Sequence, residues 1–221
     1  MKRLRASTIT LVVGGVWSIA VGTAVAQDTS TKKADMPTAR SYLSASAVDG
    51  RIYAIGGLSD QTISLPTVEV YDPVSDTWTR KADMPTPRLG LSTSVVHGRI
   101  YAIGGLPGAG VVGAACSKVE EYDPVANTWV EKADIPMPRL CHTTVAVDDR
   151  IYAIGGHSSE PGDLGTIFST VEVYDPATKT WTRKANMPTA RTGLSAGVVE
   201  GKTYAIGGTA GSPWNRVFHT M

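Results

Sequence analysis

The eight residues Lys33-Ala-Asp-Met-Pro-Thr-Ala-Arg40 return three times with small changes, as Lys81-Ala-Asp-Met-Pro-Thr-Pro-Arg88, Lys132-Ala-Asp-Ile-Pro-Met-Pro-Arg139 and Lys184-Ala-Asn-Met-Pro-Thr-Ala-Arg191. Each copy is followed by a Tyr-Ala-Ile-Gly-Gly block whose first glycine lies 16 residues after the arginine. The glycine pairs are Gly56 and Gly57, Gly104 and Gly105, Gly155 and Gly156, and Gly207 and Gly208. A sequence that returns at a fixed period indicates a repeat architecture.

Three of the units continue with Val-Glu-x-Tyr-Asp-Pro and then Thr-Trp, which supply Tyr71, Tyr122 and Tyr174, and Trp78, Trp129 and Trp181. The repeats span approximately 33–80, 81–131, 132–183 and an incomplete 184–221. An arginine before the first strand, a double glycine after an apolar run, and a spaced Tyr and Trp resemble the kelch repeat. The resemblance implies an all-β fold, a β-propeller of four-stranded antiparallel blades.

The residues of one unit agree with such a blade, whose strands we name A to D in chain order. Strand A is apolar and small, and it is followed by a two-residue turn such as Asp49-Gly50, which suits a tight hairpin. Strand B, Ile52-Tyr-Ala-Ile55, is apolar on both faces and needs cover on both. Strand C holds Val-Glu-x-Tyr and ends at Asp-Pro, and strand D holds the Trp. The Trp is expected to seal one blade against the next.

The first and last units indicate how a ring of blades could close. The fourth unit has no strand D, whereas Ser30 to Met36 aligns with Trp78 to Met84, a strand D without its Trp. We therefore expect residues 29–34 to supply the outer strand of the last blade in a four-bladed ring. The alternative is a truncated propeller fragment, which has an open apolar edge and no independent function.

The first 26 residues differ from the repeats. Lys2, Arg3 and Arg5 precede an apolar stretch over residues 9–25 that ends in Ala24-Val-Ala26. This order is typical of a secretory signal peptide. We expect cleavage after Ala26, a mature domain of residues 27–221, and a secreted or periplasmic kelch-repeat protein of bacterial type without a stable membrane anchor. An uncleaved anchor is the alternative, because the stretch is nearly long enough to span a bilayer.

Charge argues against a nucleic-acid partner. The formal net charge is +1, and removing residues 1–26 takes away three positive charges, which leaves −2. No basic run with interleaved aromatic residues is present.

Length varies only in the loops between strands B and C, which we call the B-to-C loops. From the first glycine to the valine of strand C the count is 12, 15, 16 and, if Val217 is the counterpart, 10. Loops on a fixed scaffold often carry binding. We therefore expect a non-catalytic scaffold that binds a protein, peptide or glycan through this face, with His142, His157, Glu160, Asp163 and Phe168 as candidate contacts.

The four repeated arginines begin the innermost strands on the same face. Arg40, Arg88, Arg139 and Arg191 could form a ring that holds carboxylates bidentately. The alternative is a structural role, in which they donate to carbonyl groups between blades.

Catalysis is a second hypothesis, because the kelch family includes sugar-active enzymes such as sialic acid mutarotases. His142, His157, Glu160 and Asp163 could supply an acid and a base, although each is equally compatible with a solvated loop. The tyrosine, histidine and cysteine set of a copper-radical oxidase has no match, and no cofactor is expected. His142 and His157 would need a third donor to bind a metal, so surface histidines are the preferred reading and no metal site is assigned.

The two cysteines, Cys116 and Cys141, are expected on the same face of adjoining blades. An oxidising compartment would favour a disulfide between them, and two free thiols are the alternative.

Overall fold

The computed structural model describes residues 30–59, 63–108, 113–159, 165–210 and 216–217. The expected signal peptide lies outside the described residues, as do Glu160 and Asp163. Residues 34–221 form one compact unit, and the following description concerns that unit. Within the described ranges, no helix of sufficient length and apolarity to cross a membrane occurs.

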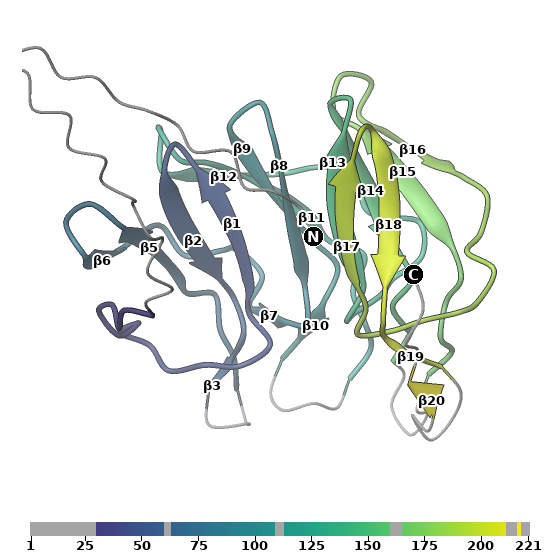
Figure 1. Ribbon diagram of the computed structural model, residues 1–221, viewed down its shortest axis with the longest axis horizontal. Helices are drawn as coiled ribbons and strands as arrows, with labels where there is room; N and C mark the ends of the chain where they lie inside the picture. Colours follow the sequence, from purple (N-terminus) through teal and green to yellow (C-terminus); the bar gives the residue numbers. More distant parts are fainter. Residues whose placement is uncertain (1–29, 60–62, 109–112, 160–164, 211–215, 218–221) are drawn as a thin grey trace, which may run out of the picture. The chain divides into compact units, whose positions relative to one another are not determined.

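The fold is all-β, as predicted, and the repeats form antiparallel sheets (Figure 1). Three blades have four strands each, in the order A, B, C, D. They are β1 (Ser44–Val48), β2 (Arg51–Ile55), β5 (Val68–Asp72) and β6 (Thr77–Arg80); β8 (Ser92–Val96), β9 (Arg99–Ile103), β11 (Val119–Asp123) and β12 (Thr128–Glu131); and β13 (Thr143–Val147), β14 (Arg150–Ile154), β15 (Val171–Asp175) and β16 (Thr180–Arg183). The fourth blade has β17 (Ser195–Val199) paired with β18 (Lys202–Ile206).

The turns between strands A and B have the predicted two-residue form. In the first blade Val48 pairs with Arg51, and the central residues Asp49 and Gly50 have φ angles of 48° and 72°. Two positive φ angles define a type I′ turn, whose twist matches that of the flanking strands. Asp148-Asp149 is the one A-to-B turn that has no glycine, and both residues adopt positive φ, at 48° and 59°.

The glycine pairs allow neighbouring blades to touch through their backbones. The amide of Gly57 in the first blade donates to the carbonyl of Arg88 in the second, at 2.9 Å. A Cβ on Gly56 would lie 2.6 Å from the same oxygen. The same bond recurs from Gly105 to Arg139 and from Gly156 to Arg191, so the expected close approach of backbones is confirmed.

Apolar cores fill the spaces between the first three blades. The core between blades one and two is built from the apolar residues Val48, Tyr53, Ile55, Val68, Val70, Met84, Leu91, Ile100, Ala102 and Tyr122. A similar set fills the space between blades two and three. Trp129 packs on the first core, and its Nε1 donates to the Ala82 carbonyl at 3.0 Å, so the tryptophan seals adjoining blades as predicted.

The fourth blade departs from the sequence-based expectation in two ways. Val217 lies in β20 (Arg216–Val217), which pairs with β19 (Thr209–Ala210), and it therefore does not begin a strand C beside β18. Residues 30–34 form no strand, and Ala34 accepts a hydrogen bond from Trp78 of the first blade. The predicted outer strand from residues 29–34 is therefore wrong over its described part, and closure of a ring stays a prediction.

Candidate functional site: the B-to-C loop face

The B-to-C loops and the chain segments that enter strand A lie at the same end of the blades, which we call the loop face. Short strands lie at this end: β3 (Leu58–Ser59) with β4 (Ile63–Ser64), β7 (Arg88–Leu89) with β10 (Leu106–Pro107), and β19 with β20. Figure 1 labels β3, β7, β10, β19 and β20 there. Isolated bridges join Ser41 to Leu58, Leu140 to His157, and Thr192 to Thr209. The predicted common face is therefore present.

Buried leucines support this face under three of the blades. Leu58, Leu89, Leu106 and Leu140 form one cluster, each at most 6% exposed. They follow either the glycine pair or the repeated arginine. After the glycine pair of the third unit, His157 stands in place of leucine. Its Nδ1 is 2.8 Å from the Thr192 hydroxyl oxygen. The underside of the loop face is thus apolar beneath the first blades and polar near the fourth.

The loops of adjoining blades are bonded to one another. The amide of Ser64 donates to the Gly108 carbonyl at 3.0 Å, and the amide of Ala115 donates to the Ser159 carbonyl at 3.0 Å. These bonds hold the described parts of three loops as a continuous surface across the blades.

The repeated arginines are buried inside the blades. Arg88 is fully buried and donates to the carbonyls of Gly104 and Lys118 at 2.7 and 2.8 Å, and to the Glu120 carboxylate at 2.7 Å. The same ion pair recurs between Arg40 and Glu69, at 3.1 Å, and between Arg139 and Glu172. Arg191 is 9% exposed and donates to the Gly207 carbonyl at 3.3 Å.

This geometry supports the structural alternative for the arginines and does not support a carboxylate-binding ring. Burial lowers the pKa of Arg139 and raises the pKa of Glu172, and the attraction between the two groups opposes both shifts. The sequence carried a signal for this pairing, because each complete unit has both the arginine and the strand C glutamate.

Phe168 lies over one of these buried ion pairs. The guanidinium carbon of Arg139 is 5.3 Å from the centre of the Phe168 ring, a cation–π arrangement. The Phe168 amide also donates to the Gly156 carbonyl, and its carbonyl accepts from the Arg191 amide. Phe168 is partly exposed and covers the arginine, so a structural role accounts for its position.

The two histidines do not form a shared site. His142 occupies the place that leucine has in the other units, and its ring lies against Gly104 of the preceding blade. It is 6% exposed, and neither ring nitrogen has a hydrogen-bond partner. Burial, together with the charges of Arg139 and Arg88, lowers the pKa of His142 well below its ordinary value, and burial lowers the pKa of His157. The described residues contain no cluster of three or more metal-ligating side chains.

The structure holds both cysteines as free thiols, which is the alternative to the disulfide. Cys141 packs beside the leucine cluster, and burial raises the pKa of its thiol to about 11. Cys116 is partly exposed at the end of its B-to-C loop. The tyrosines and tryptophans of strands C and D have the expected structural role, since each pair stacks across the hairpin with ring centres 4.9 to 5.2 Å apart.

Two exposed apolar side chains on the loop face were not among the predicted contacts. Tyr42 is 58% exposed, and Ile63 in β4 is 57% exposed. Tyr42 stands two residues after Arg40, where the second and fourth units have Gly90 and Gly193. Its φ of 52° matches the glycine values of 61° and 62°. The available signal was that a tyrosine replaces a repeated glycine.

Comparisons with known proteins agree with the repeat. Residues 12–156 match the KLHDC2/KLHL20/DRC7 Kelch-repeats domain, and residues 138–188 match the Kelch motif. Kelch-like protein 7 of Rattus norvegicus is 43% identical over 187 residues, which are 85% of this chain and 31% of that protein. Kelch-like protein 35 of Mus musculus is 30% identical over 162 residues, 73% of this chain and 26% of that protein.

Each of these relatives is much longer, because the chain spans less than a third of their length. Among solved structures, that of YjhT has a TM-score of 0.68 at 20% identity and covers 80% of this chain and 60% of that one, which supports the propeller fold alone. The family matches cover more than half of the sequence. The chain therefore belongs to the kelch-repeat family.

Proposed function

We propose that the loop face binds a protein, peptide or glycan partner outside the cytoplasm, without catalysis. The observation that carries this proposal is Tyr42, an exposed aromatic side chain held at a backbone position that favours glycine. Tyrosine provides a large, rigid contact surface with a polar end, a common anchor of binding surfaces.

The backbone at Tyr42 has the left-handed conformation that glycine adopts in the second and fourth units. A left-handed conformation costs a residue other than glycine roughly 1–2 kcal/mol, and strain of this kind often accompanies function. The Tyr42 carbonyl accepts a hydrogen bond from the Gly90 amide at 2.9 Å, which joins the segment to the next blade. The side chain is thereby displayed from a fixed backbone next to the inner strands.

The surface around Tyr42 suits an adaptable contact. Ile63 adds a second exposed apolar group from the loop of the same blade. Hydrogen bonds between neighbouring loops hold the first three B-to-C loops together. Export rests on the charged, apolar and small-residue order of residues 1–26. Of the acid and base groups considered for a sugar-active enzyme, His142 is buried and His157 is bonded to Thr192, so no specific observation favours that alternative.

The test is the variant Tyr42→Gly, which installs the residue that two other units already use. Immobilised protein would be offered the extracellular fraction of its source and, separately, a glycan array, and captured ligands would be quantified. We expect Tyr42→Gly to lose at least tenfold in affinity. The free energy of unfolding should change by no more than about 1 kcal/mol, because relief of strain offsets the greater freedom of glycine in the unfolded chain.

The matched control is Val74→Gly in the turn between strands C and D, at the opposite end of the blade. Val74 is 97% exposed, so this variant makes a similar surface change away from the loop face. The Val74→Gly variant should capture the same ligands with unchanged affinity. Retention of full affinity by folded Tyr42→Gly would overturn the proposal.

A further inference from the structure

The fourth blade has a strand edge that its counterparts do not have. In the other blades, strand B pairs with strand A on one side and strand C on the other, as in β2, where Ile52 pairs with Tyr71 and Ala54 with Glu69. Strand β18 pairs with β17 and with no other described strand. Its second edge therefore presents backbone amides and carbonyls that could accept another strand.

Apolar side chains of this blade are exposed where their counterparts are buried. Tyr204 is 39% exposed, whereas its counterparts Tyr53 and Tyr101 are 5% and 4% exposed. Ile206 is 45% exposed, whereas the matching isoleucine of the first blade, Ile55, is fully buried. The open edge is thus part of an apolar surface, and the equivalent surface is buried in the first two blades.

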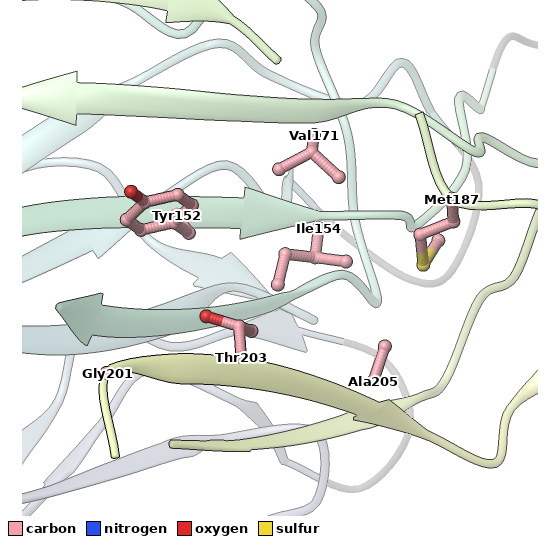
Figure 2. Close-up of a pocket in the computed structure, with 7 residues that line it drawn as sticks. All are labelled: Tyr152, Ile154, Val171, Met187, Gly201, Thr203 and Ala205. Carbon is pink, nitrogen blue, oxygen red and sulfur yellow. The ribbon is translucent and has the colours of Figure 1, made fainter. Parts of the chain in front are cut away.

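A cavity of about 340 Å³ lies between the third and fourth blades. Figure 2 shows Tyr152 and Ile154 on one strand and Thr203 and Ala205 on the facing strand, with Val171 and Met187 beside them. The corresponding residues between blades one and two belong to the buried core, and there Tyr122 of strand C completes it.

The cavity corresponds to the place of that strand C tyrosine. Tyr122 lies against Tyr53, and Tyr174 lies against Tyr101, with ring centres 6.0 Å apart in both pairs. Tyr152 is the next tyrosine in this series, and the described part of the fourth blade supplies no partner ring for it. The lining therefore matches the surroundings of a tyrosine that enters from a strand beside β18.

We propose that the open edge of β18 binds an extended segment of the type Val-Glu-x-Tyr-Asp, which adds as an antiparallel strand and places its tyrosine in the cavity. By the register of the other blades, this tyrosine pairs with Thr203 and the glutamate with Ala205. The glutamate then faces Arg191, the counterpart of the three arginines that pair with strand C glutamates. Backbone bonds would supply affinity, and the tyrosine and glutamate would supply specificity.

The occupant is an extended segment other than the described strands of this type, because those strands are already used. Each of β5, β11 and β15 lies between two partners in its own sheet. A second folded copy therefore has no such strand to offer. The proposed site is separate from the loop face, and it does not depend on the function proposed for that face.

A synthetic peptide that copies Thr170–Arg183 contains strands C and D of the third blade and serves as the probe. Its binding to the purified protein would be measured by fluorescence anisotropy, and the melting temperature would be measured with and without peptide. We expect saturable binding and a rise in melting temperature. A peptide carrying Tyr174→Ala should bind at least tenfold more weakly.

Two protein variants locate the site. Ala205→Phe fills the cavity from β18 and should abolish binding while the protein stays folded. Thr203→Ile installs the residue that stands opposite tyrosine in the other blades and should retain or strengthen binding. Binding that is equal for the tyrosine and alanine peptides, or equal in Ala205→Phe, would overturn the proposal. A concentration-dependent dimer that the peptide does not dissociate would also overturn it, because the edge would then be covered by a second copy.

Discussion

Replacing His142 by leucine should stabilise the protein, and the gain should increase as the pH falls. His142 is buried, and its two ring nitrogens have no hydrogen-bond partners. The other units place Leu43, Leu91 and Leu194 at this position, against the glycine pairs. Leucine therefore fits the space and removes a polar group that is buried without compensation.

The expected gain in the free energy of unfolding has one part that does not depend on pH and one part that does. A buried polar group without a partner costs about 1–3 kcal/mol, which is the expected gain at pH 8. Because burial lowers the pKa of His142, the folded protein keeps it neutral below pH 6.5, whereas the unfolded chain takes up a proton. Wild-type stability is therefore intact above about pH 6.5 and is lost as the pH falls, by about 2 kcal/mol at pH 5.

Chemical denaturation of both proteins at pH 8 and pH 5 measures this difference. The advantage of His142→Leu should be about 2 kcal/mol larger at pH 5, equivalent to about 4–8 °C in melting temperature for a domain of this size. His157, whose pKa is also lowered, acts equally in both proteins and cancels. The control variant is His97→Leu, which removes a histidine whose side chain is exposed. An advantage that is the same at both pH values would refute the reasoning.

Three further changes test the scaffold. Asp149→Gly should raise the free energy of unfolding by about 0.5–1 kcal/mol, because a type I′ turn favours glycine there, and a denaturation curve no more stable than wild type would contradict this. Arg88→Met should lower the free energy of unfolding by about 3–5 kcal/mol, because it leaves Glu120 buried without its partner. Adding Glu120→Met should recover most of this loss. If the losses of the two single variants simply add in a double-mutant cycle, the ion pair is not supported. In the native protein, iodoacetamide should modify Cys116 before Cys141, because desolvation raises the pKa of the partly buried Cys141 thiol. Equal rates of modification by mass spectrometry would exclude this.

Local features of the fold could be predicted from the sequence because their determinants lie close together along the chain. The turn at Asp49-Gly50 and the pairing of β1 with β2 follow from a hairpin only a few residues long. The structural roles of the glycine pairs and of the tryptophans could also be predicted, because these residues recur in the repeats. Val217 was assigned wrongly because spacing alone was used, and no Val-Glu-x-Tyr sequence supported the assignment.

The candidate site was harder to predict because it depends on which side of a strand a residue faces. The arginines were correctly placed at the start of the inner strands, but their side chains turn into the blades toward glutamates about 30 residues away. His142 was treated as a surface group, although its position in the repeat is otherwise leucine. Tyr42 was missed, because its exposure depends on a backbone conformation that was not considered at this position.

The hydrogen bonds from the tryptophan indoles also have a consequence for how the chain folds. Trp78, Trp129 and Trp181 each donate to the carbonyl of an alanine 44 to 48 residues earlier, in the segment that enters the same blade. The sequence separation of the two bonded residues is therefore about one repeat, and it does not increase with the number of blades. Nearest-neighbour architectures of this kind can begin to fold locally and extend one unit at a time. We therefore expect each new blade to fold against the preceding one as the chain emerges from the ribosome.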